Sequence, residues 1–213
     1  MMTLARSMLR NAMILGVFAA VTTGMIAGFN QLTSARIEAS RQEELAKTLN
    51  TLLPASEYDN ALLTDTLTIQ DDTLLGHQVP ETVWRATRQG QPVAVLFPVI
   101  APDGYSGRIR LLVAIRANGE MAGVRALAHR ETPGLGDAIE AAKSDWILGF
   151  NGKSLQNPDE SGWQVRKDGG VIDQFTGATI TPRAVVKAVH LALLYYRDHR
   201  EMLFTPAPHP EKS

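Results

Sequence analysis

The sequence predicts an α+β fold: a single N-terminal transmembrane helix, followed by a domain with an antiparallel sheet and flanking helices. Three observations support this prediction. A long segment near the N-terminus has no charged residue, the middle of the chain alternates strand-like stretches with tight-turn signals, and an apolar pattern of helical period follows near the C-terminus. With 213 residues, of which 45% are hydrophobic, the chain can bury a core of ordinary domain size.

The N-terminal segment is long enough to cross a membrane. Residues 11–35 include no charged side chain, and residues 12–29 are apolar apart from glycines and two threonines. A spanning helix needs about 20 apolar residues, whereas the apolar part of a cleaved signal peptide, the alternative interpretation, has about 7–15. We therefore expect an uncleaved transmembrane helix at residues 11–35, preceded by a short tail at residues 1–10.

Basic residues flank this segment on both sides. Arg6 and Arg10 precede it, and Arg36, Arg41 and Lys47 follow it. The cytoplasmic flank of a membrane helix is usually the more basic one. Because the C-terminal flank has more basic residues than the N-terminal flank, the charge count does not settle the orientation.

An amphipathic helix is expected at residues 36–54, directly after the membrane segment. Its apolar residues recur at helical spacing, and Pro54 ends the pattern. These residues are Ile37, Leu45, Leu49, Leu52 and Leu53. The charged residues between them are most simply a solvated face, with a partner-binding face as the alternative.

Two hairpins predict the antiparallel sheet of a domain at residues 55–204. The first has its turn at residues 89–92, and the second has the turn signal Asn118-Gly119. The four strands are expected at residues 82–88, 93–99, 109–115 and 121–127. Connections this short join antiparallel neighbours.

The C-terminal part of the domain is expected to be mainly helical. A short helix is predicted at residues 137–143, a strand at residues 163–165, and a long helix at residues 182–197. For the long helix, Thr181 has the residue type of an N-cap and Pro182 that of a first helical residue. The tail at residues 205–213 contains three prolines and is expected to be disordered.

Composition excludes several classes of function. A formal net charge of -1 gives no electrostatic basis for binding nucleic acid. Without cysteine, the chain cannot form disulfides, thiolate zinc sites or cysteine-ligated iron–sulfur clusters. The five histidines share no ligand spacing, so no metal site is expected.

The stretch Asp173-Gln174-Phe175-Thr176-Gly177-Ala178-Thr179 is the most informative motif of the chain. An unmodified threonine is a weak nucleophile without redox chemistry, and no basic partner lies beside Thr179 in the sequence. The small residues Gly177 and Ala178 leave the backbone open to a bulky group, and the helix that follows directs free N–H groups towards an anion such as phosphate. The alternative is a polar loop that only caps this helix.

Four motifs, in this order behind one anchor, resemble the FMN-binding domain family. They are residues 103–107, residues 129–137, Asp145-Trp146 and residues 173–179. Within the family, the chain resembles most closely the G subunits of Rnf electron-transport complexes. The C subunits of sodium-pumping NADH:quinone oxidoreductases share two of these motifs and are the alternative.

The resemblance implies that FMN is joined through its phosphate to the hydroxyl of Thr179, not to that of Thr176. A flavin transferase would make this phosphoester, and Asp173 would belong to the pattern that it recognises. The protein would then lie in a bacterial cytoplasmic membrane, with its domain on the outer (periplasmic) face. It would pass electrons between other subunits of a complex that couples ferredoxin and NAD chemistry to movement of Na⁺ or H⁺.

The resemblance also implies further flavin contacts. Residues 131–136 can form a simple Pro-Gly turn, but beside the threonine motif they are expected to face the flavin. The expected contacts, besides Thr179, are Thr176, Gly177, Ala178, Glu131, Thr132, Leu135 and Gly136. Three aromatic residues, Tyr105, Trp146 and Trp163, are expected to pack in the core or on the surface, with stacking on the isoalloxazine ring as the alternative. No general acid or base is expected, since electron transfer depends on position. A flavin-free, membrane-tethered interaction domain is the competing function.

Overall fold

The computed structural model describes residues 2–205 of the chain. In the first helix it describes the backbone alone for residues 2–5, 7, 31, 32, 34, 35, 38, 39 and 41. The chain divides into two compact units, Met1–Lys47 and Thr48–Ser213. Residues 206–213, most of the tail expected to be disordered, lie outside the described part.

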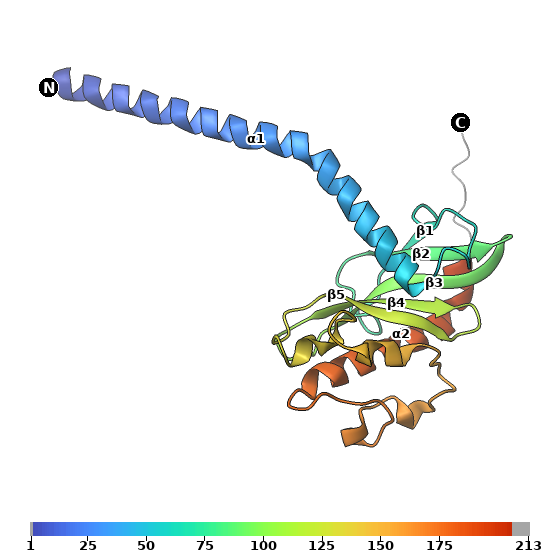
Figure 1. The fold of residues 1–213 in the computed structure, drawn as a ribbon. Helices are drawn as coiled ribbons and strands as arrows, with labels where there is room; N and C mark the ends of the chain where they lie inside the picture. The colour runs from blue at the N-terminus through green and yellow to red at the C-terminus, as the bar shows by residue number, and fades with distance from the viewer. Residues whose placement is uncertain (1, 206–213) are drawn as a thin grey trace. The chain divides into compact units, whose positions relative to one another are not determined.

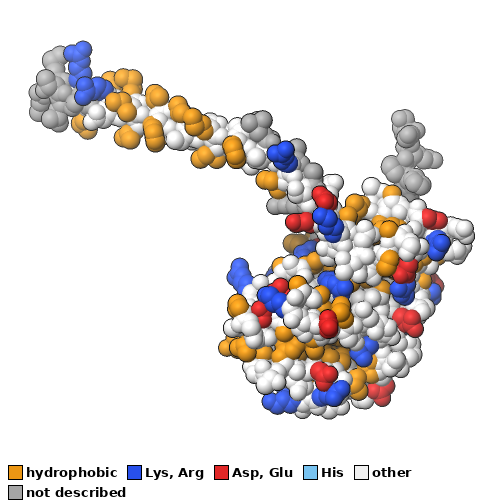
Figure 2. All heavy atoms as spheres, in the orientation of Figure 1, with side chains coloured by type: hydrophobic (Ala, Val, Ile, Leu, Met, Phe, Trp, Pro, Cys, Tyr) orange, Lys and Arg blue, Asp and Glu red, His pale blue; other side chains and the backbone are white. Residues whose placement is uncertain are grey.

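The first unit is helical throughout its described length. Helix α1 (Met2–Leu52) runs without a break from the expected tail through the membrane segment and ends two residues before the expected end of the connecting helix, and no proline occurs before Pro54 to interrupt it. Within it, Met8–Asn30 is long and apolar enough to cross a membrane. Its large apolar side chains are exposed, and they gather along the helix in Figure 2. These features are those of a single-pass membrane anchor.

The second unit is built on a five-stranded antiparallel sheet in which each strand pairs with the next (Figure 1). The strands are β1 (Thr66–Ile69), β2 (Glu81–Arg88), β3 (Gln91–Ala101), β4 (Ile109–Arg116) and β5 (Met121–Ala128). The antiparallel sheet is therefore confirmed, as are both predicted hairpins. The sequence pattern did not specify β1, which is only four residues long.

The first hairpin turn is tighter than expected. Gln89 and Gly90 both have positive φ, 51° and 74°, which is the geometry of a two-residue hairpin turn. Strand β3 consequently begins at Gln91 and includes Pro92, which lacks an N–H group. The strand tolerates Pro92 because the register of β2 and β3 shifts beside its partner, Thr87.

Helix α2 (Ile180–Phe204) covers one face of the sheet and contacts β2, β3 and β4. Val185, Val189 and Leu193 on its buried side belong to the main hydrophobic core, with Phe97 and Val113 from the sheet. The predicted helix at residues 182–197 is confirmed, and it extends further at both ends.

The start of α2 differs from the prediction. Thr179, not Thr181, is the N-cap, and Ile180 is the first helical residue. Pro182 lies within the first turn, where its missing N–H has no intrahelical acceptor in any case. Thr181 is buried, and its hydroxyl donates a hydrogen bond to the Glu131 carboxylate. The hydroxyl that was expected to cap the helix is therefore used in a tertiary contact instead.

Two other predicted elements are replaced by short 3₁₀ turns. The 3₁₀ turns of this unit are η1 (Gly136–Ile139), η2 (Asp145–Phe150), η3 (Glu160–Gly162) and η4 (Arg166–Asp168). The helix predicted at residues 137–143 is wrong beyond η1, because the backbone at Glu140 is extended. The strand predicted at residues 163–165 is also wrong: Val165 makes only an isolated bridge to Ile172, between two of these turns. Segments this short gain too few backbone hydrogen bonds to propagate a regular element.

The other face of the sheet is covered at the end of α1. Leu49, Leu52 and Leu53 are buried, as the helical pattern of apolar residues predicts. A Cβ atom on Gly123 in β5 would lie 2.7 Å from the Leu52 Cδ2 atom. Glycine at position 123 therefore lets this leucine pack closely on the sheet.

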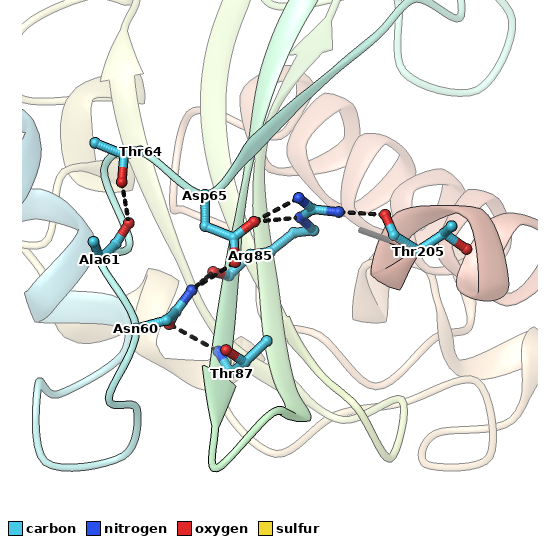
Figure 3. A network of polar contacts seen from close by, with 7 residues as sticks. All are labelled: Asn60, Ala61, Thr64, Asp65, Arg85, Thr87 and Thr205. Atoms are coloured by element: carbon cyan, nitrogen blue, oxygen red, sulfur yellow. Dashed lines mark hydrogen bonds and ion pairs between the residues drawn. The ribbon is translucent and has the colours of Figure 1, made fainter. Parts of the chain in front are cut away.

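A buried arginine joins β2 to two other segments (Figure 3). The Arg85 Nε atom lies 2.8 Å from Asp65 Oδ1, and its Nη1 atom donates to the backbone carbonyl of Thr205. Asn60 donates to Asp65 Oδ2 and to the Arg85 carbonyl, both at 2.8 Å, and accepts from the Thr87 N–H at 2.9 Å. The network ties the segment before β1 and the end of α2 to the sheet.

Two histidines of this unit are withdrawn from solvent: His77 is buried and His190 is partly buried. The His77 Nε2 atom lies 2.8 Å from the Pro98 carbonyl oxygen, while His190 stacks on Trp163 with ring centroids 5.4 Å apart. Burial lowers the pKa of both histidines, although Glu81 and Asp71 near His77, and Glu160 near His190, oppose the shift. Between the lowered pKa and the ordinary one, the unfolded chain binds more protons than the folded protein.

We expect stability to fall as the pH drops below about 6.5, the ordinary pKa of histidine. The His77→Gln/His190→Gln variant should lose less stability than the wild type between pH 7 and pH 5, because it no longer has these two protonation sites. The measurement is the urea midpoint of the full chain in detergent at both pH values. Carboxylates titrate mostly below this window. Equal pH dependence of the variant and the wild type would contradict the prediction.

Candidate functional site

A cavity of about 240 Å³ lies where the three longest sequence motifs meet. Tyr105 lines it from the loop between β3 and β4, and residues 177–181 line it from the start of α2. The loop after β5 contributes Glu131, Thr132, Leu135 and Gly136. All expected flavin contacts except Thr176 therefore lie around one cavity.

Thr179 is placed at the junction of the motif and helix α2. It is half-buried, lines the cavity, and makes no capping hydrogen bond with its side chain. Its carbonyl oxygen accepts from the Arg183 N–H at 3.2 Å, which begins the backbone ladder of the helix. Thr176 is exposed and does not line the cavity. The two threonines of the motif thus have different environments.

A tight turn positions Thr179. Gly177 has a φ of 82°, a left-handed conformation that glycine adopts without penalty, and the Ala178 N–H donates to the Phe175 carbonyl at 3.3 Å. A Cβ atom on Gly177 would lie 3.7 Å from Leu135, an ordinary contact. Glycine is therefore required here for the backbone conformation and not for space.

Glu131 links the three segments around the cavity. Its side chain is only 4% exposed, and both carboxylate oxygens accept hydrogen bonds from the protein. The Ser106 N–H donates to Oε1 at 2.9 Å, and the Thr181 hydroxyl donates to Oε2. In this structure Glu131 orients the cavity wall through these two bonds.

Gly136 lies against this carboxylate. A Cβ atom at position 136 would be 2.8 Å from Thr181 Oγ1 and 2.9 Å from Glu131 Oε2, closer than real Cβ contacts allow. Glycine at this position therefore permits the contact between the loop after β5 and the first turn of α2.

Replacement of Gly136 by alanine is expected to destabilise the protein by about 1–3 kcal/mol, because the new methyl group must separate Glu131 from Thr181. The measurement is the free energy of unfolding of the full chain in detergent. Gly149→Ala is the matched control, since a Cβ atom at Gly149 meets nothing within 4 Å. If the Gly136→Ala protein is as stable as this control, the contact between Glu131 and Thr181 accommodates the methyl group without loss of stability, and the prediction is wrong.

The rim of the cavity is apolar. Tyr105, Leu135 and Ile180 line it and are 66%, 45% and 46% exposed, so three large apolar side chains meet solvent around one cavity. Among the described residues, Glu131 is the one charged residue of the lining, and its carboxylate faces protein donors. A flat, mainly apolar ligand with a few polar atoms suits such a surface.

Three residues of this lining were not among the expected contacts. They are Tyr105, Ile180 and Thr181. Tyr105 was expected to pack in the core or on the surface, and its exposed side chain lines the cavity. Its position within the motif at residues 103–107 was the available signal, whereas Ile180 could be inferred only from its place beside Thr179.

Trp146, Trp163 and Asp173 lie outside the cavity lining. The Trp146 indole N–H donates to the Asp173 carbonyl at 2.7 Å, and Trp163 is buried in the core. The Asp173 carboxylate is exposed and pairs with Arg166 at 2.9 Å. Asp173 is therefore accessible to a partner protein.

A larger cavity, of about 380 Å³, lies elsewhere in the domain. It is lined by the turn of the second hairpin and by later turns of α2, including Asn118, Leu193 and Arg197. None of the expected site residues reaches it, so it does not belong to the candidate site.

Comparison with known proteins agrees with these motifs. The model of the FMN-binding domain family matches residues 104–194, a range that contains the lining of the smaller cavity, and the model of the RnfG N-terminal region matches residues 1–52. The G subunit of the ion-translocating oxidoreductase complex of Pseudomonas aeruginosa (strain UCBPP-PA14) is 52% identical over 201 residues, 94% of each chain. This chain belongs to the family of Rnf complex G subunits.

Other G subunits are similar over nearly the same length. That of Shewanella piezotolerans is 48% identical and covers 94% of each chain, and that of Vibrio cholerae serotype O1 is 48% identical and covers 91% of this chain and 92% of its own. As a member of this family, the protein is a redox subunit of an ion-translocating oxidoreductase complex. Its FMN-binding domain identifies FMN as the cofactor, and the other subunits of the complex are its partners.

Proposed function

We propose that the protein transfers electrons through one FMN that is joined covalently, by its phosphate, to the hydroxyl of Thr179. The observation that supports this proposal most directly is the position of Thr179. Its side chain makes no capping hydrogen bond, and the residue lines the apolar-rimmed cavity within the segment matched by the FMN-binding domain. Thr176, by contrast, is exposed and does not line the cavity.

The bond requires an activated donor. FMN itself ends in a phosphate monoester, and condensation of that ester with an alcohol in water is unfavourable. We propose flavin adenine dinucleotide as the donor and a flavin transferase as the catalyst. The Thr179 oxygen attacks the flavin-side phosphorus, the phosphoanhydride bond breaks, and AMP leaves. The hydroxyl proton passes to a base of the transferase or to solvent.

The first turn of α2 suits a phosphate at this position. The first N–H groups of a helix have no intrahelical acceptor, and in α2 these belong to Ile180 and Thr181, since Pro182 has none. They give the helix start a partial positive charge that favours an anion. Tyr105, Leu135 and Ile180 offer apolar surface for the isoalloxazine ring. Bound there, the FMN would supply the redox chemistry on which electron transfer depends.

The proposed setting is the bacterial cytoplasmic (inner) membrane, with α1 among the lipids and the FMN domain on the periplasmic face. The complex would couple electron flow between ferredoxin and NAD to movement of Na⁺ or H⁺. The apolar stretch Met8–Asn30 and the named complex of the relatives support a membrane location. Labelling an introduced cysteine in intact cells with an impermeant maleimide tests the orientation, because the chain has none of its own.

The test of the cofactor bond uses the wild-type full chain, purified in detergent and incubated with a flavin transferase and flavin adenine dinucleotide. We expect a fluorescent band after denaturing electrophoresis and a mass increase of one FMN. Omission of the transferase should leave the chain unlabelled. An unlabelled chain in the complete reaction would instead favour a flavin-free, membrane-tethered interaction domain.

A further inference from the structure

One aromatic residue outside the cavity contacts the modification motif at two points. Trp146, in η2, donates its indole N–H to the Asp173 carbonyl oxygen at 2.7 Å. Its ring also meets the Phe175 ring edge-to-face, with centroids 4.9 Å apart. Both ends of the segment 173–175 are therefore held by the same side chain.

Trp146 is itself held in place. Its backbone N–H donates to the Ser144 hydroxyl at 3.2 Å, which caps η2. The ring also contacts Phe150 edge-to-face at 5.3 Å, and Phe150 is fully buried in the main core. The contacts of Trp146 thus connect the motif to a rigid part of the domain.

The contacts with Trp146 determine which groups of the threonine motif face the protein and which face solvent. Because the Asp173 carbonyl and the Phe175 ring face Trp146, the Asp173 carboxylate and Thr176 are left exposed. The Phe175 carbonyl then accepts from the Ala178 N–H, and this turn places Thr179 at the cavity. Trp146 thereby acts on the acceptor threonine through Phe175 and the turn.

We propose that Trp146 is a positioning residue for the modification of Thr179: its indole N–H and ring hold residues 173–175 so that the turn presents the threonine hydroxyl to the transferase. This inference rests on the proposed function, since it assumes that Thr179 is the acceptor. Trp146 touches neither the hydroxyl nor the cavity, so its effect is on the population of the competent loop conformation.

The decisive variant is Trp146→Phe, which keeps an aromatic ring beside Phe150 and Phe175 but removes the N–H donor. Trp163→Phe is the matched control. It removes another indole N–H, which donates to the Ser154 carbonyl at 3.2 Å, and Trp163 contacts Phe150 but not the motif. Both variants lose one hydrogen bond and one indole ring from the same region.

The first measurement is the steady-state rate of FMN transfer to the full-length apoprotein in detergent, as a function of apoprotein concentration. For Trp146→Phe we expect the KM for the apoprotein to rise about threefold to tenfold with kcat unchanged, because the lost hydrogen bond lowers the fraction of competent acceptor. For Trp163→Phe we expect an unchanged KM, whatever its loss of thermal stability. Equal KM values for the two variants would overturn the proposal.

The second measurement needs no flavin. Hydrogen exchange at the Ala178 amide reports the turn directly, and we expect it to be about threefold to tenfold faster in Trp146→Phe than in the wild type or in Trp163→Phe. Unchanged exchange would overturn the positioning role. If the wild type takes up no flavin, the proposed function fails, while hydrogen exchange still decides what Trp146 does to the loop.

Discussion

The Thr179→Ala protein is expected to carry no covalent FMN at all. The phosphoester needs an oxygen on the residue that lies at the cavity, and alanine removes that oxygen while leaving the turn and helix start intact. The Thr179 side chain makes no capping hydrogen bond, so its loss should change stability little. The measurements are flavin fluorescence in a denaturing gel and intact mass after incubation with the transferase.

Two companion variants make this result specific. Thr176→Ala removes the other hydroxyl of the motif and should still be labelled, although more slowly if the transferase contacts that side chain. Thr179→Ser keeps a hydroxyl at the acceptor position and should retain labelling. If Thr179→Ala carries FMN and Thr176→Ala does not, the acceptor has been assigned to the wrong threonine.

Loss of the buried arginine in Figure 3 should produce the largest change in stability. Arg85→Met leaves the Asp65 carboxylate without its cation and the Thr205 carbonyl without its donor, while methionine fills part of the space. Because Arg85 is buried and Asp65 is mostly buried, we expect a loss of about 3 kcal/mol in the free energy of unfolding. Urea unfolding of the full chain in detergent, followed by circular dichroism, measures it.

Lys187→Met is the control for this variant. Lys187 pairs with Asp103 at 2.9 Å, but both side chains are more than half exposed. Exposed ion pairs contribute little, so this change should stay within about 0.5 kcal/mol. A similar, small effect for both variants would mean that the Arg85 network does not stabilise the domain.

Local patterns in the sequence predicted much of the fold. The anchor follows from an uninterrupted apolar stretch, and the hairpins follow from turn residues between strand-like segments. Each signal lies within about 20 residues of chain, so no knowledge of distant contacts is needed. The boundaries were less accurate where a tertiary contact competes with a local preference, as at Thr181, whose hydroxyl binds Glu131 instead of capping α2.

In the candidate site, too, local sequence patterns predicted some residues, whereas others depend on tertiary contacts. The motif at residues 173–179 led to the proposal of Thr179 through its resemblance to a flavin-attachment pattern, whose residues are consecutive in the sequence. The roles of Glu131 and Trp146 depend on partners 50 and 27 residues away, Thr181 and Asp173. No local pattern in the sequence specifies such distant pairs. From the sequence alone, a residue that contacts the flavin could therefore not be distinguished from one that orients the cavity wall, as Glu131 does, or the threonine motif, as proposed for Trp146.

The sequence by itself determined the anchor, the antiparallel hairpins, the long C-terminal helix and the threonine motif, because each depends on neighbouring residues. Only the tertiary structure decided that residues 103–107, 131–136 and 177–181 meet around one cavity, that Thr179 occupies the N-cap position of α2 without a side-chain cap, and that Thr176 lies outside the cavity lining. The physical reason is that packing of the sheet against α2 brings these loops together. Their final contacts are chosen by burial and hydrogen bonding across the fold, which local propensity does not contain.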